Sequence, residues 1–420
     1  MTSEFEKNLE KYADVIVKIG LNLQPRQRLL IGAPLPYNHG TSIELAPLVR
    51  LITKRAYQIG VRMVEVMWDD DQLHLIRFQN APKDSFEEYP TWRTDGAFEM
   101  ANNKDAILFF VGWNPDLLKE QDSKLFMRTV QSFLKYNKAF SELRHKDVMN
   151  NLAVPGAIEG WAEKVFPNLA PEKRKTQLWD TIFEICRVKE KDPISAWKEH
   201  VHQLTAISKY LTKRQYKSLK LIAPGTNLSI GLPNNHVWQA AQSTSKDGID
   251  FVGNIPTEEV FTLPHKDKIE GYVTATKPFS LAAVIERFKL HFSEGKIVKA
   301  SAKKGEDYLH NLLETDEGAI RLGEIALVPH SSPISQTGLL FYNILLDENA
   351  SSHIAIGSAW RYCLEGGNEM SDEVFSAAGG NISKIHIDFM IGSSEMDVEG
   401  ILENGNTEPI MRKGEWAFEI

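Results

Sequence analysis

SLKLIAPGTNLSIGL, residues 218–232, marks the point where the pattern of this 420-residue chain changes. From Ser218 onward the apolar runs are short and are separated by turn residues, which predicts a series of short strands. One helical pattern, EDYLHNLLETDEGAIRLG at residues 306–323, is inserted among them. The other strands are expected in KIEGYVTAT (268–276), GEIALVP (323–329), GLLFYNILL (338–346), SKIHIDFMIG (383–392) and DVEGILENG (397–405). This half is therefore expected to be an α+β domain with a mostly antiparallel sheet.

In the half before Ser218, helical and strand patterns alternate along the sequence. Apolar residues recur at helical spacing in residues 5–19 and again in ELAPLVRLITKRAYQIG, residues 44–60. Short apolar runs follow each helix and read as strands: RLLIGAP (28–34), VRMVEVMW (61–68) and DAILFFVGW (105–113). This alternation is typical of an α/β layer with a parallel sheet. We therefore expect two domains, an N-terminal α/β domain at residues 1–215 and a C-terminal α+β catalytic domain at residues 216–420.

The composition limits what the protein can bind. Hydrophobic residues make up 42% of the chain and charged residues 25%, which are ordinary values for a globular protein. A formal net charge of −8 argues against a nucleic-acid partner, because phosphate binding needs a concentrated positive surface. Two cysteines fit a reducing compartment. The acidic residues of MTSEFEKNLEKYADVIVKIG argue against a secretory signal or a membrane anchor, so we expect a cytoplasmic protein.

Two polar residues in an apolar strand pattern suggest a site. His386 and Asp388 are two residues apart, so both side chains point to one face of a strand. A solvated sheet face gives the same alternation, and the pair alone does not distinguish the two interpretations. Glu324 and His353 each stand next to an apolar run as well, although a capping or hydrogen-bonded role would explain either one.

Two more carboxylates occur in the turn PTEEVF, which contains Glu258 and Glu259. One of these glutamates, together with the four residues above, gives two imidazoles and three carboxylates. That set suits two divalent ions, because carboxylates can bridge the ions and imidazoles can complete the coordination. Such a centre can hold a hydroxide at neutral pH. The candidate ligands are scattered along the chain, and the compact H-E-x-x-H helix motif is absent from the sequence.

Several long stretches resemble the thermophilic aminopeptidase family, the aminopeptidase T and aminopeptidase S metallopeptidases. They include NIPTEEVFTLPHK, LGEIALVP, LDENASSHIAIGSA, LEGG and IHIDFMIGS, and the resemblance extends over nearly the whole chain. It implies a two-domain, homodimeric peptidase with a dinuclear metal centre in the C-terminal domain, holding zinc or cobalt, with magnesium or manganese as alternatives. The family's metal positions correspond to Glu258, Glu324, His353, His386 and Asp388, with Glu259 as the alternative to Glu258.

One position departs from the family pattern. The family carries a catalytic tyrosine seven residues after its first ligand histidine, and this sequence has Trp360 there. An indole donates one hydrogen bond but cannot exchange a proton as a phenol does. Either Trp360 donates to the oxyanion of the tetrahedral intermediate, or Tyr362 takes over the role. The change raises doubt about catalysis but leaves metal binding untouched.

The resemblance implies hydrolysis of the first peptide bond of small peptides, with Glu324 or Glu259 carrying the proton from water to the leaving amine. Two alternatives stay open at this point. One is a metallohydrolase that acts on another amide or ester. The other is a catalytically weak homologue that binds peptide or metal, for which Trp360 is the main support.

Overall fold

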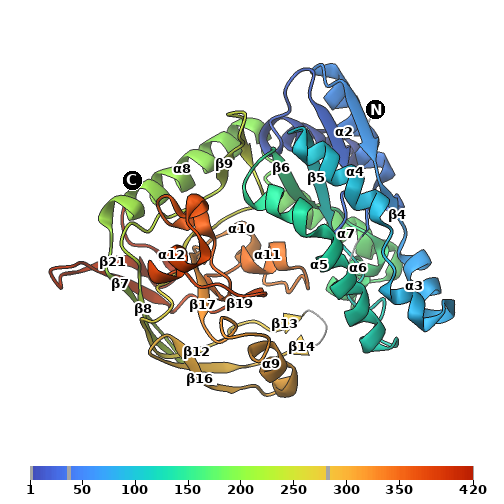
Figure 1. Ribbon diagram of the computed structural model, residues 1–420. Coiled ribbons are helices and arrows are strands. Elements are labelled where there is room, and N and C mark those ends of the chain that lie inside the picture. Colours follow the sequence, from blue (N-terminus) through green and yellow to red (C-terminus); the bar gives the residue numbers. More distant parts are fainter. Residues whose placement is uncertain (1–2, 36–38, 281–283, 420) are drawn as a thin grey trace. The chain divides into compact units, whose positions relative to one another are not determined.

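The computed structural model describes residues 3–35, 39–280 and 284–419, and Figure 1 shows its helices and strands. The chain divides into two compact units. Unit 1 contains Met1–His200 and Gln242–Pro256, and unit 2 contains Val201–Ala241 and Thr257–Ile420. The domain boundary expected at residue 215 stays a prediction. Within the described residues, every helix is too short or too polar to cross a bilayer.

Unit 1 is built on a four-stranded sheet in which all neighbours are parallel. The order is β3 (Met63–Val66), β1 (Arg28–Ile31), β5 (Ala106–Val111) and β6 (Asn151–Pro155). All residues of β6, and all of β5 except Val111, are buried, as expected where helices cover a parallel sheet. This arrangement confirms the α/β prediction.

The helices of unit 1 connect these strands. The first begins at a capping box, in which Ser3 and Glu6 satisfy each other's backbone N–H groups. It continues into a π-helix, Ile16–Gly20. The helices are α1 (Glu4–Val15), α2 (Ala46–Gln58), α3 (Asp71–Asn80), α4 (Thr91–Asn102), α5 (Ser123–His145), α6 (Glu159–Val165) and α7 (Pro171–Ile185). Helix α8 (Pro193–Arg214) follows, and the boundary between His200 of unit 1 and Val201 of unit 2 falls within it.

Smaller elements complete unit 1. Strands β2 and β4 pair in parallel, and strands β9 and β10 pair antiparallel. Their bounds are β2 (Thr41–Ser42), β4 (Trp68–Asp69), β9 (Gln242–Thr244) and β10 (Asp250–Val252), and two 3₁₀ helices span Ile43–Leu45 and Lys83–Glu87.

Unit 2 contains an eight-stranded sheet whose neighbours are all antiparallel. The order is β16 (Lys296–Ser301), β15 (Lys289–Ser293), β12 (Ile269–Thr274), β8 (Thr226–Gly231), β7 (Ser218–Ala223), β20 (Asp397–Ile401), β21 (Thr407–Arg412) and β22 (Glu415–Trp416). The turn between β7 and β8 is Pro224–Gly225, and Gly225 has a φ of +80°, which glycine adopts readily. The predicted antiparallel sheet is confirmed.

A second antiparallel sheet in unit 2 has the order β11 (Val260–Thr262), β17 (Leu322–Leu327), β18 (His353–Gly357) and β19 (His386–Met390). Every residue of β17 and β18 is buried, so the sheet forms part of the core. Strands β13 (Phe279–Ser280) and β14 (Val284–Ile285) pair with each other and form a separate two-stranded sheet.

The predicted strand at residues 338–346 is wrong. Tyr342 has a φ of +54°, which interrupts an extended chain, and helix α11 (Ile344–Glu348) follows. The carboxylate of Asp347 accepts hydrogen bonds from the backbone N–H groups of Phe341 and Asn343, at 2.8 and 3.0 Å. These bonds use donors that a neighbouring strand would need.

The remaining helices of unit 2 are short. The helix predicted at 306–323 is confined to α9 (Glu306–Leu313), and Asp316 then closes a turn by accepting the N–H groups of Gly318 and Ala319. The others are α10 (Pro333–Gln336), α12 (Asp372–Ala377) and two 3₁₀ helices, Arg361–Cys363 and Gly367–Glu369.

Candidate metal centre

The register of the four-stranded sheet brings the candidate ligands to one face. Glu324 on β17 pairs with Ala355 on β18, and Ala355 pairs with Asp388 on β19. Residues directly opposite each other in a sheet share a face. His353 and His386 are each two residues from a member of this row, so they share that face too. The polar face predicted around His386 is therefore shared by three neighbouring strands, β17, β18 and β19.

The side chains of these residues meet in two groups that share Glu324. In the first, Nε2 of His353 lies 3.1 Å from Oε2 of Glu259 and 3.6 Å from Oε1 of Glu324. In the second, Nε2 of His386 lies 3.4 Å from Oε2 of Glu324 and 3.5 Å from Oδ1 of Asp388. Glu324 thus turns one oxygen to each group, which is the arrangement of a carboxylate that bridges two ions.

Backbone carbonyls orient both histidines. Nδ1 of His353 lies 3.1 Å from the carbonyl oxygen of Ser351, and Nδ1 of His386 lies 2.7 Å from that of Ser358. A carbonyl only accepts, so Nδ1 carries the proton in each ring. In the neutral form of each ring, which is the form that binds a metal ion, the Nε2 lone pair faces the carboxylates. Metal-binding histidines are commonly held in this way, with the second ring nitrogen donating to a backbone carbonyl.

The electrostatics of the cluster also suit cations. Oε2 of Glu259 and Oδ1 of Asp388 are buried and accept no hydrogen bond. Burial raises the pKa of Glu259. For Glu324, burial opposes ionisation, but the two histidines lower its pKa to about 2. Buried carboxylates repel each other and lose their hydration, which costs free energy. Bound cations would offset this cost by pairing with the free acceptor oxygens. The donor set therefore fits a pair of divalent ions.

The two adjacent glutamates of the PTEEVF turn have different environments. Glu259, the alternative in the sequence-based assignment, is in the first ligand group, whereas Glu258, the residue first assigned to the metal, is in neither group among the described residues. Glu258 is also buried, and its backbone N–H donates to Oδ1 of Asn349 at 2.7 Å. The structure thus brings together five of the predicted site residues and leaves Glu258 beside them.

Trp360 lies against the cluster. Its indole Nε1–H donates to Oε2 of Glu324 at 2.7 Å, and its ring packs on the His386 ring with a centroid separation of 4.7 Å. The ring of Tyr362 stacks on the ring of Trp360, with a centroid separation of 5.8 Å. Tyr362 belongs to the 3₁₀ helix Arg361–Cys363.

Glu348 is a further carboxylate that the sequence reasoning missed. Burial raises the pKa of Glu348 well above its ordinary value, and the charges of Asp388 and Glu259 raise it further. It ends helix α11, five residues before His353.

Comparisons with known proteins agree over the full length of the chain. The family described as thermophilic metalloprotease (M29) matches residues 5–416. The chain is 43% identical to aminopeptidase 2 of Geobacillus stearothermophilus, over 100% of both chains. It is 44% identical to aminopeptidase AmpS of Bacillus subtilis (strain 168), over 99% of both. The solved structure of wild-type AmpT from Thermus thermophilus superposes with a TM-score of 0.91 at 38% identity and covers 99% of this chain and 100% of that one.

Proposed function

Because the chain belongs to the thermophilic metalloprotease (M29) family, we propose that it is a metal-dependent aminopeptidase that releases N-terminal amino acids from small peptides. The family match confirms the resemblance predicted from the sequence. The names of the two relatives support the aminopeptidase assignment. The single observation that carries the proposal is the pair of ligand groups that share Glu324.

The proposed metal ligands are Glu259, Glu324, His353, His386 and Asp388. Their two imidazoles and three carboxylates would hold two divalent ions, zinc or cobalt, with magnesium or manganese as alternatives. Bound there, the ions would act as Lewis acids that activate a water molecule and the scissile carbonyl. Two ions contribute +4 and three carboxylates −3, so the centre would carry a small positive charge that suits this chemistry.

We assign the proton transfer to Glu348. With Glu259 among the ligands, Glu348 borders the cluster, as Glu258 does, without belonging to either ligand group of the described residues, and the charges of Asp388 and Glu259 act on it. A carboxyl group at the border of the centre can accept a proton from water and deliver it to the leaving amine. This replaces the assignment of that role to Glu324 or Glu259.

The homodimer and the cytoplasmic location stay predictions that rest on the family resemblance and on composition. The second candidate function is the catalytically weak homologue. Trp360 favours this function, because it stands where the resemblance places a catalytic tyrosine. Its indole N–H already donates a hydrogen bond to Glu324. Turnover of peptides by the metal-loaded protein distinguishes the two functions.

The adjacent glutamates provide a matched test of the site. Glu259→Gln and Glu258→Gln remove one charge each from neighbouring buried positions. We expect Glu259→Gln to weaken metal binding by more than the roughly 10–100-fold typical of an outer-shell change, and to abolish dipeptide hydrolysis. Glu258→Gln should keep both within about 10-fold. Metal affinity is measured by isothermal titration calorimetry, and hydrolysis by the release of free amino acids.

The reverse result, loss of metal by Glu258→Gln alone, would return the ligand role to Glu258. If both variants bind metal as tightly as the wild type, the proposed first ligand group is wrong. N-acetylated dipeptides serve as the substrate control, because an aminopeptidase requires a free amine.

A further inference from the structure

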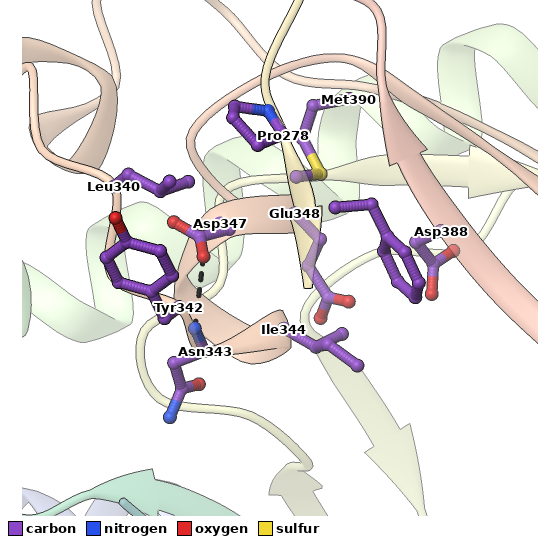
Figure 2. A pocket seen from close by; sticks show the side chains of 10 residues that line it. Pro278, Leu340, Tyr342, Asn343, Ile344, Asp347, Glu348, Asp388 and Met390 are labelled. Carbon is purple, nitrogen blue, oxygen red and sulfur yellow. Dashed lines mark hydrogen bonds between the residues drawn. The ribbon is translucent and has the colours of Figure 1, made fainter. Parts of the chain in front are cut away.

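A pocket in unit 2 borders the candidate metal centre. Figure 2 shows it with the side chains of Asp388 and Glu348 among those that line it. Asp388 belongs to the second ligand group, so the pocket and the proposed metal centre have one wall in common. Its walls also include Pro278, Leu340, Ile344 and Met390, together with the aromatic residues Phe279 and Tyr342; we call it the aliphatic pocket after the first four.

Regular secondary structure builds the shared wall. Met390 lies two residues after Asp388 on β19, so both side chains stand on the same face of the strand. Ile344 and Glu348 are four residues apart on α11 and therefore share one face of that helix. The segment that leads to Pro278 is tied to the strand, because Thr276 N–H donates to the carbonyl oxygen of Met390 at 2.9 Å.

We infer that the aliphatic pocket receives the side chain of the substrate's first residue and selects short, uncharged aliphatic side chains. The inference rests on the proposed aminopeptidase function. An N-terminal amine that binds at the metal centre is one bond from Cα, and Cα is one bond from the side chain. The first side chain must therefore lie beside the ligands, and the pocket that shares Asp388 with them is within this reach.

The size of the aliphatic pocket favours small side chains. Its cavity volume is about 20 Å³, room for one water-sized group, and a methyl group is of similar size. Met390 is unbranched and can change rotamer, so a somewhat longer aliphatic chain can enter at a cost. A ring or a long cationic chain exceeds the available space.

The polar groups of the pocket do not favour charged side chains. Asp347 is occupied by the backbone N–H groups of Phe341 and Asn343, and Figure 2 draws the second of these bonds. Asp388 and Glu348 belong to the metal centre and its border. Among the described residues that line the pocket there is no Lys, Arg or His. The lining carboxylates would repel an acidic side chain.

Hydrolysis of X-Gly dipeptides, with X as Ala, Leu, Phe, Lys or Glu, tests the inference in the metal-loaded protein. The wild type should show a kcat/KM for Ala-Gly at least about 10-fold above that for Phe-Gly, since one methylene in a pocket changes it by about 10–200-fold. Ile344→Ala should shift the Phe:Ala ratio toward Phe by about 10-fold, and Ile344→Phe should shift the Leu:Ala ratio toward Ala. Ile382→Ala is the matched control, because Ile382 is 39% exposed and does not line the pocket.

A second measurement is independent of turnover. Calorimetric affinities of zinc-loaded protein for free alanine and phenylalanine should shift in the same direction in the Ile344 variants. If Ile344→Ala fails to fold, Ile344→Val makes a smaller change of the same sign.

The outcomes separate the two proposals. Turnover by all variants with substrate ratios equal to those of Ile382→Ala would overturn the pocket assignment and leave the aminopeptidase intact. Absence of turnover in the wild type with every dipeptide and metal contradicts the proposed function, and with it the inference.

Discussion

Among single residues, Trp360 contacts both the shared carboxylate of Glu324 and the ring of His386. Its indole N–H donates to the Glu324 oxygen that faces His386, so it holds the shared carboxylate in place. We expect Trp360→Phe to weaken metal binding by about 10-fold, because a buried carboxylate oxygen loses a donor worth about 1–3 kcal/mol. Trp360→Tyr, which keeps a donor, should lose less. Calorimetric metal titration of both variants checks this.

The same pair of variants tests the earlier oxyanion hypothesis. A donor to the oxyanion typically contributes about 10²–10³ in kcat. If Trp360→Phe binds metal like the wild type and loses only kcat, Trp360 acts on the transition state and does not position Glu324.

The candidate ligands could be predicted from the sequence where they lie on a regular strand, because the strand repeat fixes which face a side chain takes. His386 and Asp388 are fixed on one face by alternation alone, and His353 and Glu324 are brought to that face by strand pairing. The choice between Glu258 and Glu259 was not predictable, because they lie in an irregular segment before β11, where no repeat fixes the direction of a side chain. Glu348 depends on a tertiary contact and carries no sequence motif.

At the scale of elements, the pairing of β18 with β19 holds the site, and Gly357 allows it. Gly357 pairs with His386 and has a φ of +99°; a Cβ there would lie 2.1 Å from the carbonyl oxygen of Ile385. Gly357→Ala should therefore lower the free energy of unfolding by about 2 kcal/mol or more, and weaken metal binding by moving His386. Denaturant unfolding and metal titration measure the two effects.

Gly366→Ala is the matched control. Its φ is +67°, also left-handed, but a Cβ there has nothing within 4 Å. It should cost only the conformational strain, about 1 kcal/mol, and keep the metal affinity. Equal losses from the two substitutions would contradict the proposed link between the β18–β19 pairing and the site.

Elements were predictable where the apolar period is long and regular, as in β5 and α2. The error at residues 338–346 has a local cause. Leu, Phe and Tyr favour a strand there. The carboxylate of Asp347 instead accepts hydrogen bonds from two backbone N–H groups, and the chain forms a helix. Side-chain to backbone bonds of this kind leave no periodic signal.

At the scale of the whole molecule, the two fold classes follow from patterning, with a parallel sheet in unit 1 and antiparallel sheets in unit 2. The division between the units is harder to predict, because Gln242–Pro256 returns to unit 1 after the first strands of unit 2. Only long-range contacts reveal such a return. The proposed metal centre and the aliphatic pocket lie entirely within unit 2.

We propose that one cluster in unit 2 holds two ions and that this centre hydrolyses the first peptide bond. The most direct measurement strips the protein of metal, adds Zn²⁺ or Co²⁺ stepwise, and follows both bound metal and the release of free amino acid from Ala-Gly. We predict no release from the stripped protein and full activity at two ions per chain. Activity without metal, activity that saturates at one ion, or silence with two ions bound would contradict it.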